Sequence, residues 1–152
     1  MMSKIVGRRR WVPIIIFGVT LVGLSLKVSA QERKIETEVL AKSITDWRGV
    51  LLPAYSEGQP EVTVARITIP KGMALPLHEH PFMTAGVVLQ GTIEVRTDSG
   101  DTHIAQAGDA VVELINQAHG GANIGEEDAV ILAVYAGIEG EPVTVPLSTP
   151  DS

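Results

Sequence analysis

Cysteine is absent from the sequence, which excludes disulfide bonds and thiolate metal ligands. Aromatic residues make up only 4% of the chain and histidines number four, so any clustering of these residues would be conspicuous. The sequence has no internal repeat, no glycine-rich phosphate loop and no nucleophile elbow. Its 152 residues suffice for one domain, and a hydrophobic content of 45% is ordinary for a chain that buries a core.

Acidic residues are missing from positions 1–30, which carry five basic residues. A basic stretch ending at Arg10 precedes a 16-residue uncharged apolar run from Trp11 to Leu26, and Val28-Ser29-Ala30 is typical of a cleavage site. Residues 1–30 are therefore predicted to be an export signal, which implies a periplasmic or secreted protein. The alternative is an uncleaved membrane anchor, although 16 residues are short for crossing ~30 Å of hydrocarbon.

The adjacent Arg8 and Arg9 also resemble the start of a twin-arginine signal, which would send an already folded protein across the membrane. The chain beyond residue 30 holds 7 basic residues against 18 acidic ones, a net charge of −11. This charge predicts a soluble domain that does not bind nucleic acid.

Strand signals fill the chain from residue 56 to residue 146. Val62 to Ile69 is rich in β-branched residues, Thr92 to Thr97 alternates apolar with polar residues, and Ala129 to Ala136 is a nearly continuous apolar run. Turn residues lie between such segments at Asp98 to Asp101 and Ala107 to Asp109. We therefore predict an all-β sandwich or barrel over residues 56–146.

The flanking segments carry weaker signals. Residues 31–55 are predicted to form an N-terminal arm, with a short helix or a loosely held terminus before Arg48 as alternatives and a short strand at Gly49 to Leu52. Toward the other end, Val143 to Val145 is predicted to extend one sheet edge, and residues 147–152 are predicted to be a flexible tail.

Three of the four histidines are candidate metal ligands. His78 and His80 are two residues apart on an extended segment, so both imidazoles point to the same face and can reach one ion at about 2.0–2.1 Å each. His119 follows 39 residues after His80, which leaves room for one hairpin to go out and return. We predict that the three meet inside a small β-barrel; the alternative is a hydrogen-bonded pocket without metal. His103 is predicted to lie on the surface.

The spacing around these histidines resembles that of the cupin family. Gly72, His78, His80 and Gly91 match its first motif, and Gly108, His119 and Asn123 match its second. The sequence departs from the motifs at three positions: Thr84 replaces the first-motif glutamate, and Leu114 and Asn116 replace the proline and glycine of the second motif. The resemblance covers roughly Val62 to Tyr135.

This resemblance implies a single-domain, jelly-roll β-barrel that binds a divalent transition metal (Fe, Mn, Zn, Cu or Ni) and a small-molecule ligand. It also implies a possible homodimer formed through edge strands. Among metal-bearing cupins it points to oxygenases, lyases, isomerases and decarboxylases, and a dioxygenase-like reaction is the expectation we favour. The alternative is a non-catalytic module that binds a small molecule or a metal.

Because Thr84 offers at most a hydroxyl, the sequence favours either a site of three histidines alone or a carboxylate from elsewhere in the chain. Glu113 is the candidate, as a metal ligand or a general base, since it lies six residues before His119 and a tight connection would bring the two strands side by side. The alternative is that Glu113 faces solvent. Thr84, Asn123 and Tyr135 are candidate substrate-binding residues, although Asn123 could instead close a turn. The orientation of Glu113 distinguishes an enzyme from a binding module.

Overall fold

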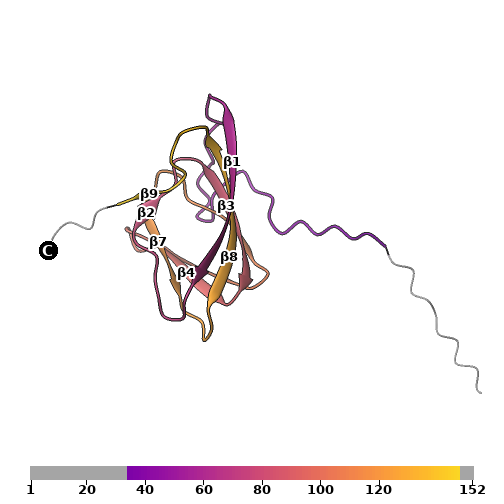
Figure 1. Ribbon diagram of the computed structural model, residues 1–152, viewed down its shortest axis with the longest axis vertical. Helices are drawn as coiled ribbons and strands as arrows, with labels where there is room; N and C mark the ends of the chain where they lie inside the picture. Colours follow the sequence, from indigo (N-terminus) through magenta and orange to yellow (C-terminus); the bar gives the residue numbers. More distant parts are fainter. Residues whose placement is uncertain (1–33, 148–152) are drawn as a thin grey trace, which may run out of the picture. The chain divides into compact units, whose positions relative to one another are not determined.

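The computed structural model describes residues 34–147 (Figure 1). The predicted export signal and all but the first residue of the predicted tail lie outside the described residues. Within residues 34–147 there is no helix, and hence none that is long and apolar enough to cross a membrane. All strands belong to the compact unit that begins at Thr37.

The described part of the chain forms two antiparallel sheets, as the all-β prediction requires. The first sheet has the strand order β1-β8-β3-β6 and the second has the order β5-β4-β7-β2-β9. The strands are β1 (Pro60–Ile69), β2 (His78–Glu79), β3 (Met83–Gln90), β4 (Thr92–Thr97), β5 (Thr102–Gln106), β6 (Ala110–Val112), β7 (His119–Asn123), β8 (Ala129–Ile138) and β9 (Val145–Pro146). Figure 1 shows β1, β3 and β8 on one side and β2, β4, β7 and β9 on the other.

The core joins the inner faces of both sheets. Side chains of one sheet pack against those of the other, and burying each large aliphatic side chain contributes roughly 1.5–3 kcal/mol. The buried cluster comprises Ile69, Val88, Val111 and Ala129 from the first sheet and Ile93, Val95 and Ala105 from the second.

The register of the first sheet separates this core from a pocket at the other end of the strands. Ile69 pairs with Ala129 at the core end of β1 and β8, whereas Thr84 of β3 pairs with Tyr135 toward the opposite end of β8. Both Thr84 and Tyr135 are buried and line the pocket. The fold therefore packs one end tightly and leaves the other end hollow.

The predicted strand positions agree with the observed ones except near the ends of the domain. The predicted strand at Gly49 to Leu52 is wrong, because only an isolated bridge between Thr45 and Leu51 forms there. Residues 34–48 form no helix. The C-terminal edge strand lies at Val145–Pro146, slightly later than predicted, and it pairs with β2.

Candidate metal centre

The three predicted histidines lie together. β2 and β7 pair so that His78 stands directly opposite His119, and His80 follows immediately after β2. Their ring centroids are 4.6 to 5.0 Å apart, and one ring nitrogen from each lies within 4.8 Å of the others. His80 and His119 are buried, and His78 is partly buried. Each ring therefore offers one nitrogen to a common point.

Each imidazole is held by a main-chain carbonyl at its Nδ1 atom. Nδ1 of His78 lies 2.8 Å from the carbonyl oxygen of Pro76, and Nδ1 of His119 lies 2.7 Å from that of Gln117. Nδ1 of His80 lies 3.0 Å from the carbonyl oxygen of Val143. A carbonyl oxygen only accepts hydrogen bonds, so Nδ1 must carry the proton and the Nε2 lone pair stays free. This is the arrangement that orients metal-binding histidines.

The surroundings of the two buried rings, those of His80 and His119, favour their neutral form. Burial, reinforced by the neighbouring histidines, lowers the pKa of His80 to about 4. Burial likewise lowers the pKa of His119, with smaller contributions from the charges of His78 and Arg48. Neutral imidazole is the form that binds a metal, so the fold favours the ligating state over the protonated one.

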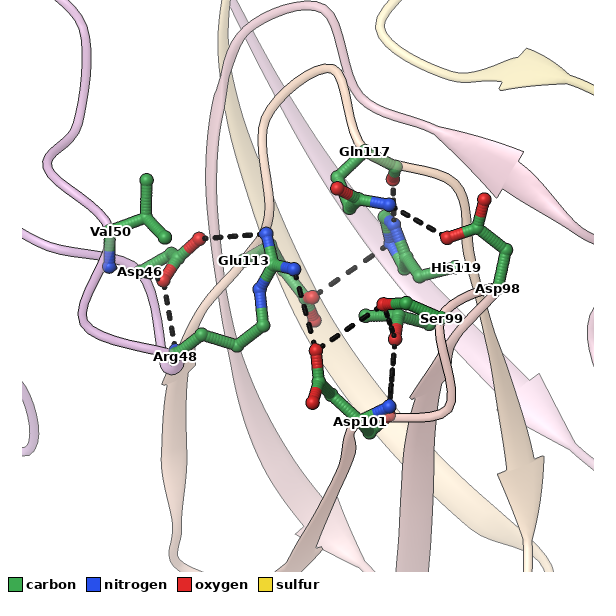
Figure 2. A network of polar contacts seen from close by, with 10 residues as sticks. Asp46, Arg48, Val50, Asp98, Ser99, Asp101, Glu113, Gln117 and His119 are labelled. Atoms are coloured by element: carbon green, nitrogen blue, oxygen red, sulfur yellow. Dashed lines mark hydrogen bonds and ion pairs between the residues drawn. The ribbon is translucent and has the colours of Figure 1, made fainter.

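Glu113 faces this cluster. One carboxylate oxygen, Oε2, lies 3.9 Å from Nε2 of His119, as Figure 2 shows. That oxygen is buried and has no hydrogen-bond partner within the described residues. Burial raises the pKa of Glu113 to about 7, partly offset by a backbone hydrogen bond from Leu114. The carboxyl group is therefore able to exchange a proton near neutral pH.

Glu113 reaches the cluster by a different route from the one predicted. The expectation that the strands of Glu113 and His119 lie side by side is wrong, because β6 belongs to the first sheet and β7 to the second. The connection between them crosses from one sheet to the other. Asn116 turns this connection with a backbone φ of 52°, and its N–H donates to the carbonyl of His80 at 2.9 Å. Glu113 and His119 thus approach from opposite walls.

This donor set fits a divalent transition metal. Three neutral imidazole nitrogens suit Zn, Cu, Fe or Ni, and ligands of this type leave further coordination positions open. The unpartnered Oε2 of Glu113 beside Nε2 of His119 supports the same assignment, since a buried carboxylate oxygen needs a cation or a donor. His78, His80 and His119 would hold the ion, with Glu113 within reach of it.

The histidines and Glu113 open onto a cavity of about 260 Å³ between the two sheets. Its walls are mostly apolar and come from strands of both sheets and the segment before β2; they include Ile67, Leu75, Ile93, Val95, Ile131 and Ala133. A small molecule in this cavity would lie against the histidine cluster. The arrangement is a ligand pocket with a few convergent polar groups, which is typical of active sites.

Comparison with known proteins agrees with the two-motif spacing and the fold. Residues 65–135 match the family described as "Cupin domain". This segment is a cupin domain. A search of curated protein sequences gives no significant match.

Solved structures with a similar fold include the following three. A cupin-like protein from Thermotoga maritima aligns with a TM-score of 0.52 and 19% identity over 58% of this chain and 65% of that one. A Klebsiella pneumoniae protein with a double-stranded beta-helix domain aligns with a TM-score of 0.51 and 21% identity over 74% of this chain and 100% of that one. An oxalate oxidase in complex with the substrate analogue glycolate aligns with a TM-score of 0.49 and 26% identity over 57% of this chain and 46% of that one. This chain thus matches less than half of the oxalate oxidase.

Two other predicted site residues of the cupin domain line its pocket. Thr84, at the position of the motif glutamate, is buried and donates its hydroxyl to the carbonyl of Phe82 at 3.0 Å. The Tyr135 ring packs against that of His80 with centroids 5.4 Å apart. Burial raises the pKa of Tyr135, so its phenol stays protonated. Both residues are placed to contact a ligand.

Asn123 does not belong to the pocket, contrary to the prediction that it contacts substrate. It lies at the far end of β7 from His119, about 13 Å along the strand. Its side-chain amide donates to the carbonyls of Ile69 and Glu127 at 2.9 and 2.7 Å, and its Oδ1 accepts from the N–H of Gly125. Asn123 therefore closes the turn after β7, because all of its polar atoms are used there.

The arm contributes residues that the sequence interpretation missed. Asp46 forms a turn by accepting the N–H groups of Arg48 and Val50, and the Arg48 guanidinium contacts both Asp46 and Asp101 (Figure 2). The N–H of Trp47 donates to the carbonyl of Val112, directly before Glu113. The Trp47 ring stacks on His103, which is partly buried rather than fully on the surface. This turn could have been predicted from the segment Asp46-Trp47-Arg48-Gly49, since Asp and Gly favour turns.

Proposed function

We propose that this protein is an exported, metal-dependent enzyme that acts on a small organic molecule, and that its reaction is dioxygenase-like. His78, His80 and His119 bind the metal, and Glu113 is the general base. One observation carries this proposal: the buried, unpartnered Oε2 of Glu113 lies 3.9 Å from Nε2 of His119. A binding module has no need of a proton-transfer group at that position.

The protein's own residues supply orientation and proton transfer. The carbonyls of Pro76, Val143 and Gln117 fix the histidine rings, so little reorganisation is needed when a ligand enters. Glu113 accepts a proton from the substrate at Oε2, and its pKa of about 7 lets it release that proton again near neutral pH. The apolar walls keep bulk water away from the reacting atoms.

A bound divalent metal would supply Lewis acidity, which lowers the pKa of a coordinated substrate oxygen. Thr84 and Tyr135 line the same cavity and would contact the substrate opposite the histidines. Glu113 would then remove the substrate proton that lies nearest to the metal-bound oxygen.

Elemental analysis of the purified protein is the first test. We expect a near-stoichiometric transition metal in the wild type and its loss in the His78→Ala/His119→Ala double variant. Absence of metal from the wild type, purified from its native compartment, would contradict the metalloenzyme proposal.

Oxygen consumption with a panel of small enols and phenols is the second test. Glu113→Gln should keep the metal but lose at least about tenfold of the rate, as is typical of a lost general base. Glu79→Gln is the matched control, because Glu79 lies between His78 and His80 and does not line the cavity. Ligand binding without turnover in the wild type would favour the non-catalytic module instead.

Export is part of the proposal and rests on residues 1–30. Cell fractionation should place the protein in the periplasm or the medium, and replacing Arg8 and Arg9 by lysine should block this if the twin-arginine route is used. Recovery of the wild-type protein only in the cytoplasm would argue against export.

A further inference from the structure

The charge of the cavity wall is unusual for a metal site that handles organic acids. Among the described residues that line the cavity, none is lysine or arginine, and Glu113 is the single carboxylate. Arg48 lies nearby but contacts Asp46 and Asp101 rather than the cavity. Within residues 34–147, the cavity wall therefore presents no lysine or arginine to a negatively charged ligand.

The remaining polar groups of the wall are largely occupied. The hydroxyl of Thr84 donates to the carbonyl of Phe82, and the hydroxyl of Thr144 lies 3.3 Å from Nδ1 of His80. Apart from Tyr135, the three histidines and Glu113, the rest of the cavity surface is apolar. A carboxylate that is not on the metal would lie against Ile67, Ile131 or Val95 without a partner, and burying an unpaired charge is costly.

The size of the cavity limits the ligand further. A cavity of about 150 Å³ accommodates benzene. The volume of about 260 Å³ found here therefore suits one substituted ring or an aliphatic compound of similar size.

We propose that the cavity selects a small, uncharged, mostly apolar molecule of about single-ring size, which presents one carbonyl or hydroxyl oxygen to the histidine cluster. Dicarboxylates and other multiply charged acids are excluded. This inference rests on the proposed function, because the oxygen is directed by a metal at the three histidines.

Calorimetric titration of the metal-loaded protein with matched probes tests the charge selection. Salicylamide and salicylate have the same shape, but salicylamide has a neutral amide where salicylate has a charged carboxylate. Oxalate represents the dicarboxylates. Salicylamide should bind at least about tenfold more tightly than either acid. Glu113→Gln should reduce the difference in affinity between salicylamide and the two acids, because it removes the repulsion between the Glu113 carboxylate and a negatively charged ligand. Tighter binding of salicylate or oxalate, or no binding of any probe, would overturn the proposal.

Neighbouring positions on β8 test where the ligand binds. Ala133 faces the cavity and Val134 is partly exposed on the opposite face of the strand. Ala133→Leu should reduce salicylamide affinity at least about tenfold, whereas Val134→Leu should leave it unchanged. Ala133→Val is the smaller replacement if Ala133→Leu does not fold. Equal affinities in the Ala133 and Val134 variants would place the ligand elsewhere.

Metal analysis of the same samples separates the two proposals. If the wild type contains no metal, the proposed function fails, whatever the probes show. If it contains metal and prefers oxalate or salicylate, the proposed function stands and the substrate class is wrong. Retained metal in Ala133→Leu confirms that any lost affinity arises from the filled cavity.

Discussion

Glu113 lies directly opposite Thr84, with its N–H donating to the Thr84 carbonyl at 2.9 Å. The pairing of Ala85 with Val112 sets this register, and both side chains line the same cavity. Thr84 occupies the place of the motif glutamate. The carboxylate of this site therefore stands one strand away from the expected position but at the same level of the barrel.

Moving the carboxylate back tests whether the two positions are equivalent. In the double variant Thr84→Glu/Glu113→Thr, the total charge and the side-chain types are unchanged, so we expect metal to be retained. Thr84→Glu alone places two carboxylates opposite each other and should destabilise the metal-free protein by about 1 kcal/mol or more, because like charges that face across strands repel. Elemental analysis and urea unfolding measure both effects. Loss of metal from the double variant alone would show that the carboxylate must come from position 113.

Removing the carboxylate should change how stability depends on pH in metal-free protein. The pKa of Glu113 is raised to about 7 by burial, so the folded state takes up a proton before the unfolded state does. The stability that Glu113 contributes to the folded state is fully present below its ordinary pKa of about 4.5 and is lost as pH rises through about 7. Glu113→Gln should therefore be more stable than the wild type at about pH 8, by up to roughly 3 kcal/mol, and similar at about pH 4.

Urea unfolding in the presence of a chelator provides this measurement. The lowered pKa of His80 acts in the opposite direction, because its neutral form is favoured in the fold and stability from it falls as pH drops below about 6.5. That contribution is common to both proteins, so it cancels in the difference. Parallel pH profiles for wild type and Glu113→Gln would contradict the prediction.

Asn116 controls the crossing between the sheets. Its φ of 52° is in the left-handed region, which glycine adopts freely, asparagine tolerates and β-branched residues avoid. Asn116→Gly should fold normally and keep its metal. Asn116→Val should lose roughly 1–2 kcal/mol of stability, the cost of a left-handed backbone conformation in an L-residue. Thermal unfolding with metal analysis checks this, and equal stability of both variants would refute the assignment.

Asn123 should matter for stability and not for the site. Asn123→Ala leaves the buried carbonyl of Ile69 and the carbonyl of the exposed Glu127 without their donor, which we expect to cost about 2–3 kcal/mol. Metal content and ligand affinity should be unchanged, because Asn123 does not line the cavity. A variant with normal stability and weakened ligand binding would restore the substrate-contact interpretation.

The histidine cluster was predictable because local geometry fixes most of it. His78 and His80 share a face through the two-residue period of a strand, and the spacing to His119 matches a recurring motif. The strand positions were equally predictable, since Thr92 to Thr97 alternates apolar with polar residues and Ala129 to Ala136 is a nearly continuous apolar run.

The orientation of Glu113 was not predictable in the same way. Val112, Glu113 and Leu114 alternate in polarity, and this pattern usually places the glutamate in solvent. β6 ends at Val112, however, and the chain then leaves the sheet, so both Glu113 and the fully buried Leu114 point inward. Alternation fails as a guide once the strand ends.

Long-range partners explain the other differences. The role of Asn123 depends on the carbonyl of Ile69, which is 54 residues away in the chain. The docking of Trp47 depends on Val112 and His103. Neither contact leaves a periodic signal in the sequence.

The atoms that hold the three imidazoles are main-chain carbonyls, and this affects how the protein can evolve. Any residue type can provide a carbonyl, so substitutions at Gln117 or Val143 that keep the backbone path leave the rings oriented. The aliphatic wall residues belong to other strands and can change independently. A lineage that carries this chain can therefore acquire new ligands by altering the wall while it inherits the metal-binding apparatus intact.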